Sequence, residues 1–270
     1  MISVTSAQLD AWLAAFMFPV ARLLGLFASA PIFSNRAVPV RVRLAIGLGI
    51  AMALLPTLPP MPPIPPGGGI GLLIMVQQMF IGIAIGFMMR LVFAAIDMAG
   101  SLIGMQMGLS FAVFFDPDAG GQTAVLSDFL GLVATLLFLA INGHLMLIEV
   151  LIRSFEWLPV GVNVVSASGW AQIARAGGTV FATGLLLSLP VVAVLLVANI
   201  ALGILTRAAP QLNLFAIGFP VTLAMGFIAL VLIMTNFGPV VQSLFEHGFE
   251  ATTMMLEALA PQAPAAAPPR

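Results

Sequence analysis

Long apolar segments are the feature that most limits how this chain can fold. A helix needs about 20 consecutive apolar residues to cross the roughly 30 Å hydrocarbon core of a bilayer. The runs that reach this length are Ala11–Phe33, Ile70–Ile96, Val125–Ile152, Thr179–Leu205 and Leu214–Thr235. The sequence therefore predicts an all-α integral membrane protein.

Composition supports this prediction and excludes several classes of protein. The chain is 61% hydrophobic and 7% charged, with a mean hydropathy of +1.16, whereas soluble domains carry roughly 25% charged residues. Its net charge is -1 and its nine basic residues are all arginine, so it has no basic stripe for nucleic acid. Without cysteine it has neither disulfides nor thiolate sites. The N-terminus lacks the basic region of a cleavable signal peptide, and we expect the first apolar segment to be retained.

Two shorter apolar pieces make a count of membrane crossings uncertain, and six crossings serve as a working topology. Leu44–Leu55 stops at Pro56, and Met98–Phe115 is rich in glycine and follows Asp97 directly. Both are interpreted as half-length or re-entrant segments. The basic residues of the first link, Arg36, Arg41 and Arg43, place that link in the cytoplasm by the positive-inside rule.

The remaining segments have clear compositional signatures. Residues 56–69, PTLPPMPPIPPGGG, are predicted to form a stiff non-helical loop, because proline lacks an amide proton and clashes with the preceding turn. Apolar residues recur at helical spacing among glutamates from Val241 to Leu259, which indicates an amphipathic closing helix. Residues 260–270 are an Ala/Pro-rich tail, expected to be disordered. We thus expect one helical membrane domain over residues 1–259.

Prolines inside apolar runs indicate kinked helices. Pro19, Pro31, Pro190 and Pro220 each remove a backbone hydrogen bond. Proline is also commoner in membrane helices in general, so each position has two readings. With this many breaks, we expect the helices to pack against other subunits as well as lipid.

The sequence gives little support to an enzyme. His144 and His247 are the best candidates for a general base, and neither lies in a recognised catalytic or nucleotide-binding motif. We expect His144 to make a structural hydrogen bond at a helix contact and His247 to be solvated. We predict no catalytic, cofactor-binding or metal-binding residues.

Glycines at a spacing of four could bring helices close together. Gly100, Gly104 and Gly108 form one such stripe, and Gly82 with Gly86 forms another. The contact could lie within the chain or between subunits.

Ionisable residues inside apolar runs are costly and are functional candidates. Those of this chain are Arg22, Arg90, Asp97, Glu149 and Arg207. Arg90 and Asp97 are two helical turns apart, so they could share a face. The group leaves a proton-coupled secondary transporter open as an alternative function.

A phenylalanine-rich segment lies between Gly104 and Gln122. Its bulky apolar residues stand between glycines and an Asp-Pro turn, and hydrophobic constrictions can gate a pore. The same segment could be the buried end of a helix. The candidate plug residues are Leu109, Phe111, Ala112, Val113, Phe114 and Phe115.

Several stretches resemble the FliR family of flagellar biosynthesis proteins, whose close relatives serve virulence injectisomes. The resemblance covers most of the chain. Its stretches are Arg22–Arg43, Gly104–Pro117, Phe138–Leu145, Leu158–Gly161, Ala174–Gly178 and Asn199–Pro220. The residues taken as family motif or packing positions are Arg36, Pro39, Arg43, Gly100, Gly104, Gly108, Asp116, Pro117, Gly143, His144, Arg207, Pro210, Gln211, Asn213, Phe215 and Pro220.

The resemblance implies kinked helical hairpins that join partner membrane subunits in a ring-like export gate, with one copy of this chain per gate. It implies a place in the bacterial inner membrane, at the flagellar basal body, and export of unfolded flagellar proteins through the centre. It also implies a plug loop, which would fall on residues of Gly108–Asp116. An injectisome subunit of the same architecture remains a further alternative.

Overall fold

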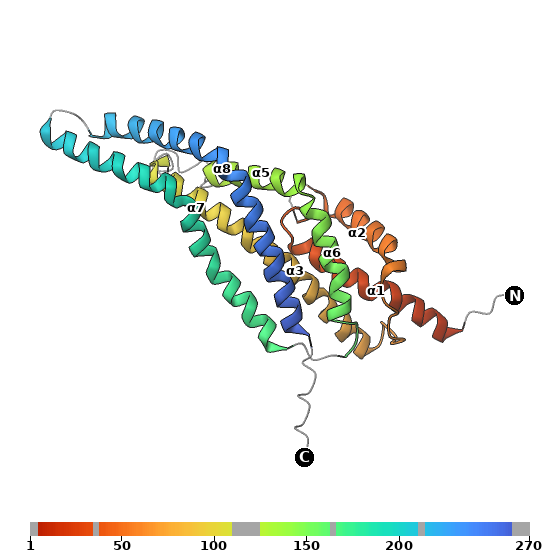
Figure 1. Cartoon of the computed structure of the whole chain (residues 1–270). Helices are drawn as coiled ribbons and strands as arrows, with labels where there is room; N and C mark the ends of the chain where they lie inside the picture. The colour runs from red at the N-terminus through yellow and green to blue at the C-terminus, as the bar shows by residue number, and fades with distance from the viewer. Residues whose placement is uncertain (1–4, 35–37, 110–124, 163–165, 210–213, 261–270) are drawn as a thin grey trace, which may run out of the picture. The chain divides into compact units, whose positions relative to one another are not determined.

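The computed structural model describes residues 5–34, 38–109, 125–162, 166–209 and 214–260. Within these ranges every regular element is a helix, as the apolar runs predict (Figure 1). The elements are α1 (Ser6–Ser29), α2 (Val40–Leu54), η1 (Leu55–Thr57), α3 (Gly69–Gln106), α5 (Val125–Ala140), α6 (Gly143–Trp157), α7 (Ala167–Ala208) and α8 (Leu214–Leu259).

The helices have the length and composition of membrane spans. Five helices of the described part could each cross a bilayer, and six segments could if the bent pair of α5 and α6 counts as one. The long apolar runs therefore identify α1, α3, α7 and α8 correctly, and α2 adds a span that the sequence interpretation treats as half-length.

α3 corrects the prediction of a separate re-entrant piece beginning at Met98. The helix continues without a break from Gly69 to Gln106, through Asp97 and the glycine stripe. The charge and the glycines indicated a break from sequence, but Asp97 is exposed and Gly100 lies against the backbone of another helix. The prediction is wrong because these glycines serve packing between helices rather than chain reversal.

The predicted span Val125–Ile152 is broken in two. α5 ends at Ala140, and α6 begins at Gly143 with its axis turned by 66°. Asn142 between them has a φ of 58°, in the left-handed region. Asparagine adopts this left-handed conformation more readily than most residues do. A residue in this conformation cannot continue a right-handed helix, so the chain changes direction here.

Two further expectations about helix ends change. The closing amphipathic helix is not separate, because α8 runs unbroken to Leu259 through Pro220 and Pro239. Pro31 lies beyond the end of α1, so it interrupts no helix, whereas Pro19 and Pro190 lie inside α1 and α7. The proline-rich link is largely non-helical as predicted, but its first residues belong to the short helix η1.

The helices form two compact units, the first made of three separate stretches of chain and the second of two. Unit 1 contains residues 1–91, 142–176 and 246–270, and unit 2 contains residues 92–141 and 177–245, so that α3, α7 and α8 each contribute to both. The tail that follows residue 260 lies outside the described residues.

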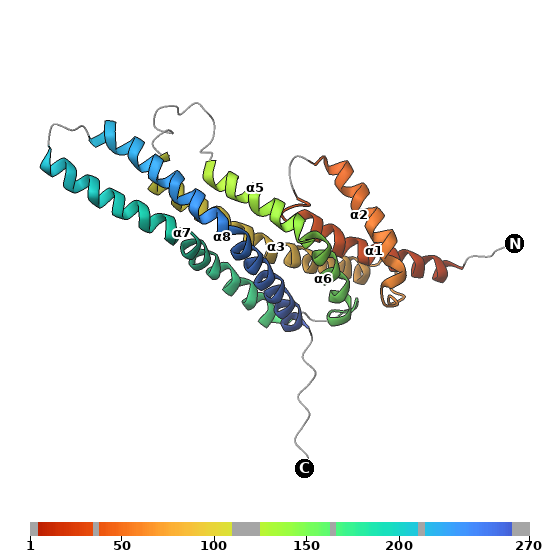
Figure 2. The same ribbon diagram turned by 45° about the horizontal axis from the view of Figure 1, so that its top comes forward.

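In unit 1, α1 packs in parallel against the first part of α3 (Figure 2). A β-carbon at Gly82 would collide with the backbone carbonyl of Arg22, and one at Gly25 would collide with that of Met79. Glycine at these positions therefore lets the two backbones touch. Gly47 brings α2 onto the other side of α1, against Leu24.

Unit 2 is held together by aromatic and glycine contacts. Phe93 of α3, Phe138 of α5 and Phe245 of α8 form a cluster with ring centroids 4.9–5.8 Å apart. Gly184 of α7 lies against the carbonyl of Ala95, where a β-carbon would be 2.9 Å from the oxygen. The second part of α3 is thus surrounded by α5, α7 and α8.

Candidate functional site

The candidate site is the base of the phenylalanine-rich loop in unit 2, where α3 ends and α5 begins. Ser127, in the first turn of α5, donates a hydrogen bond to the carbonyl of Asp97 at 2.6 Å. Its hydroxyl also lies 2.8 Å from that of Ser101. Two serines and a backbone carbonyl therefore fix the start of α5 against the last turns of α3.

Glycine allows this contact to be so close. A β-carbon at Gly100 would lie 2.5 Å from the Cα of Ser127, and one at Gly131 would lie 2.9 Å from Oδ1 of Asp97. Gly104, one turn further along α3, leaves ordinary van der Waals space to Leu126 and Leu109. The stripe at Gly100 and Gly104 thus makes a contact within this chain, as does the stripe at Gly82 and Gly86.

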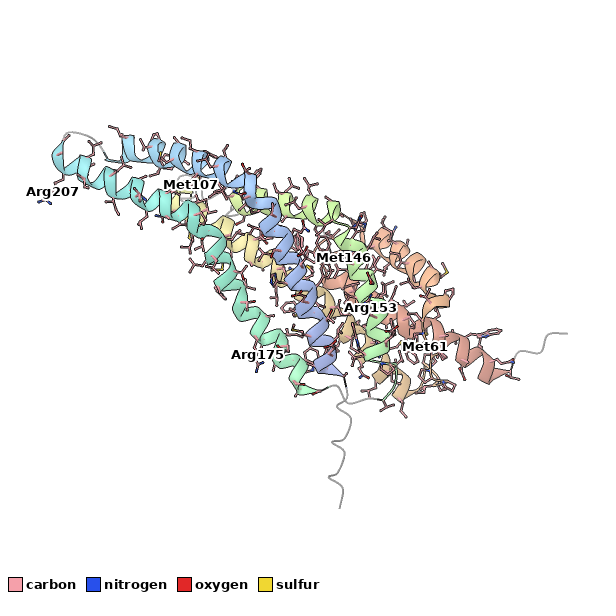
Figure 3. All side chains as sticks on the ribbon, in the orientation of Figure 1. Met61, Met107, Met146, Arg153, Arg175 and Arg207 are labelled. Carbon is pink, nitrogen blue, oxygen red and sulfur yellow. The ribbon has the colours of Figure 1, made fainter. Side chains whose placement is uncertain are left out.

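The end of α3 is fixed on its other side by α8. Met107 is fully buried, and a β-carbon at Gly226 would lie 2.6–2.8 Å from the end of its side chain (Figure 3). Gly108 then has a φ of 80°, a conformation that favours glycine, and its N–H bonds the carbonyl of Met105. The chain therefore leaves α3 at a fixed point and in a fixed direction.

Most of the predicted plug falls on residues that are not described. Leu109 is half-buried and its side chain turns back towards Gly104. The other candidate plug residues, with Asp116 and Pro117, lie outside the described residues: Phe111, Ala112, Val113, Phe114 and Phe115.

The other motif residues are dispersed along the chain. Pro39 is the residue that precedes α2, and the Arg43 guanidinium donates a hydrogen bond to the carbonyl of Val38 at 3.5 Å. Arg207 is exposed near the end of α7 (Figure 3), and Pro220 is an exposed residue of α8. Phe215 belongs to the first turn of α8. The positions outside the described residues are Arg36, Pro210, Gln211 and Asn213.

His144, for which a hydrogen bond at a helix contact is expected, makes none through its Nδ1 within the described part of the chain. It follows buried Gly143 at the start of α6, and its Nδ1 is buried without a hydrogen-bond partner among the described residues. Among those residues, no group of three or more His, Asp or Glu is placed to hold a metal ion.

Arg22 has a role that its position in an apolar run did not reveal. Its side chain is fully buried in unit 1, where Gln78 of α3 accepts hydrogen bonds from Nε and Nη2. Nη1 donates to the hydroxyl of Ser154 at 2.8 Å, and Nη2 donates to the carbonyl of Leu158 at 2.7 Å. The guanidinium also lies 3.8 Å from the centre of the Phe155 ring.

This network joins three helices through one cation. Its acceptors are all neutral, and they are 56 to 136 residues away along the chain. No local pattern could have indicated them. Glu149, by contrast, pairs with Arg153 one turn later on α6 at 2.7 Å, a spacing that the sequence does contain.

Comparison with known proteins gives a consistent result. Residues 13–248 match the model of the family described as bacterial export proteins, family 1. The flagellar biosynthetic protein FliR of Pectobacterium carotovorum is 40% identical over 96% of this chain and 99% of the relative. FliR of Escherichia coli K12 is 42% identical over 92% of this chain and 95% of the relative.

A relative of lower sequence identity also matches most of the chain. FliR of Bacillus subtilis is 30% identical over 90% of this chain and 94% of the relative. The match reaches through both units and across all the helices described above. The chain therefore belongs to the FliR family of bacterial export proteins.

Proposed function

We propose that this chain is a non-enzymatic channel subunit of the flagellar type III protein export gate and that it completes the pore for unfolded flagellar proteins. The observation that carries the proposal is the family match over residues 13–248. The relatives named above are flagellar proteins, which favours the flagellar apparatus over an injectisome.

The loop after α3 is the proposed plug. Both of its ends are anchored, one by Met107 against α8 and the other by Ser127 against α3. A loop on so rigid a base can place bulky apolar side chains in a pore and exclude water from it. Leu109 and the aromatic residues that follow it supply these side chains.

The proposed setting is the bacterial inner membrane, at the flagellar basal body. The chain associates there with other membrane subunits of the export apparatus, in one copy per gate. Large apolar side chains are exposed along α7 and α8, including Phe181, Leu186, Val197 and Val231. Such surfaces fit a protein that is covered by lipid and by partner subunits.

The plug is tested by deleting Ala112–Phe115 and measuring ion leak across the membrane in cells that assemble the gate. The deletion removes the aromatic block while the anchored ends remain, so we expect a leak at least severalfold above that of the wild type. The matched control deletes Gly121–Ala124, four residues of the same loop without an aromatic side chain, and should leave the leak unchanged.

A second variant keeps the loop at its full length. Replacing Phe111, Phe114 and Phe115 together by alanine should also raise the leak, because three bulky side chains are lost. Unchanged leak with normal export in both variants would rule out the plug. Loss of all export would instead mean that the loop is needed for assembly of the gate.

The transporter alternative requires Asp97 and Glu149 to carry protons and Arg90 to serve as a fixed positive charge, because an arginine side chain stays protonated in proteins. Glu149 is paired with exposed Arg153, which favours a solvated ion pair over a proton pathway. Asp97 lies at the contact between α3 and α5, which favours a role in packing. Neutralising all three residues would abolish export if the chain were such a transporter.

A further inference from the structure

Helix α7 is held to the rest of the chain at two places and carries no buried residue between them. At Gly169, a β-carbon would lie 2.2 Å from Cγ of Leu259 at the end of α8. At Gly184, a β-carbon would lie 2.9 Å from the carbonyl oxygen of Ala95 in α3. Each residue in between, from 170 to 183, is half-buried or exposed. We call residues 170–183 the bridge, which is about 21 Å long at 1.5 Å per residue.

Hydrogen bonds reinforce the contact at the start of the bridge. The Ser166 N–H donates to the carbonyl of Leu259 at 3.2 Å. The Ser168 hydroxyl donates to the carbonyl of Ala258 at 2.7 Å, and Figure 1 shows the start of α7 beside the end of α8. Carbonyls in the last turn of a helix have no partner within that helix, so these bonds cap α8. This end of the bridge is therefore fixed within unit 1.

The other end of the bridge is fixed within unit 2. Beyond the bridge, buried residues recur every three or four positions, at Ser188, Val191 and Leu195, which is the spacing of one helical face. The part of α7 up to Ala176 belongs to unit 1, and the part from Gly177 onward belongs to unit 2. The division between the two units therefore falls inside the bridge.

Two adjacent glycines, Gly177 and Gly178, stand in the middle of the bridge. A β-carbon at either position would meet no described atom within 4 Å, whereas one at Gly82 or Gly184 would collide with a neighbouring backbone. Glycine destabilises a helix interior relative to alanine, and here no close contact within the described chain requires it. Without β-carbons the backbone has the widest choice of φ and ψ, and sharp bends in helices occur at pairs of such small residues.

The other two helices that pass from one unit to the other are packed where they do so. α3 crosses the division after Leu91, between buried Met89 and Phe93. α8 crosses it directly after Phe245, which is buried, as is Phe249 one turn later. α7 has no buried residue at its crossing, so it can bend there without drawing a side chain out of a core.

We infer that Gly177 and Gly178 form a hinge in α7 and that the working export apparatus bends the helix there. A hinge is a small number of residues that absorb a change in φ and ψ. Bending at this pair lets α7 follow a displacement of either end of the bridge while the contacts at Gly169 and Gly184 persist. The hinge is independent of the proposed plug, whose own test is ion leak.

Distances between paired spin labels test the hinge, and the chain has no cysteine of its own to interfere. Ala171→Cys and Leu185→Cys replace exposed residues on either side of the glycines, about 21 Å apart along a straight helix. The full chain would be labelled in the particle that it forms with its membrane partners. Pulsed electron paramagnetic resonance would measure the distribution of distances between the two labels.

We expect a broad distribution that extends below the straight-helix distance when both glycines are present. Gly177→Ala combined with Gly178→Ala should narrow it by about twofold or more, because β-carbons favour the straight helix. Gly203→Ala is the matched control. Gly203 also lies in α7 and also meets no described atom within 4 Å, but it lies outside the bridge, so its replacement should leave the width unchanged.

The alanine pair should also lower the export of flagellar proteins severalfold. A second variant moves the flexible point instead of removing it, by adding Ala174→Gly and Ala176→Gly to the alanine pair. This variant should restore both the width of the distribution and export, because a hinge needs flexibility within the bridge rather than glycine at one given position.

Four results would overturn the inference. Equal widths with the glycine pair and with the alanine pair would show that α7 does not bend there. Normal export with a narrowed distribution would show that the apparatus does not use the bend. Restored width without restored export would mean that the glycines serve contact with a partner subunit. If the alanine pair prevents assembly of the particle, recovery by the moved glycines supports the hinge, and failure to recover overturns it.

Discussion

Arg22 shows how one buried cation can organise several helices. Its guanidinium donates to neutral acceptors on α3, on α6 and in the chain just after α6. A buried charge is tolerated only where such hydrogen bonds replace water. The sequence identified Arg22 as unusual, but it could not distinguish a functional charge from a structural one, because the acceptors come from remote segments.

Replacing Arg22 by methionine should destabilise unit 1 by about 3 kcal/mol or more, because Gln78, Ser154 and the carbonyl of Leu158 are left without their donor. Thermal unfolding of the purified particle in detergent would measure the loss. Arg90→Met is the matched control, since Arg90 is exposed on α3, and it should change the transition little.

The double variant Arg22→Met with Gln78→Leu should recover part of this loss. It replaces donor and principal acceptor together by apolar groups, which is often less costly than removing one of them. A single Arg22→Met variant as stable as Arg90→Met would contradict the assigned role.

At the scale of the element, the length of the apolar runs predicted where helices occur, but it did not predict where each helix ends. α5 ends at Ala140, two residues before Asn142 and within an apolar run, whereas α3 continues past Asp97. Ile141-Asn142-Gly143 did contain a local signal, a residue that tolerates positive φ followed by glycine. At Asp97 and Gly100 the sequence did not show that the glycine serves a contact between helices, because that contact is with Ser127 of α5.

The same contact limited what could be predicted of the candidate site. The sequence located the phenylalanine-rich loop and its glycines. It could not identify Ser127, Met107 and Gly226 as the anchors, because they become neighbours only through packing of α3 with α5 and α8.

Replacing a helical glycine by alanine should lower the stability at one position and raise it at another. Gly82→Ala should destabilise the particle, because its β-carbon would collide with the carbonyl of Arg22. Gly203→Ala in α7 meets no described atom within 4 Å, and it should stabilise that helix by up to about 1 kcal/mol through helix propensity. Thermal unfolding of both variants tests this, and a Gly82→Ala variant as stable as Gly203→Ala would contradict the packing described for α1.

At the scale of the whole molecule, burial is uneven among the helices. Within the most apolar window of α3, 56% of the residues are buried inside the chain, against 17% for α7 and 22% for α8. The apolar surface of α7 and α8 must therefore be covered by lipid or by other proteins. We propose that the hydrophobicity of this chain serves assembly as well as membrane insertion.

We therefore expect the chain to depend on its partners for a uniform state. Expressed alone and extracted in detergent, it should elute from size-exclusion chromatography as aggregate or as several species. Co-expressed with the other membrane subunits of the export apparatus, it should elute as one stable particle. A single symmetric peak for the chain alone, unchanged by co-expression, would contradict this expectation.

The length of α7 has a consequence for biogenesis. Its 42 residues form about 63 Å of continuous helix, roughly twice the hydrocarbon thickness. Its apolar part, Thr179–Leu205, is about 40 Å long at 1.5 Å per residue, so during synthesis it is still longer than one crossing of the hydrocarbon core requires. The excess must be shielded between translation and docking, so a newly made copy that finds no partner is a natural substrate for membrane quality-control proteases, and the supply of partners would set how much of the protein a cell retains.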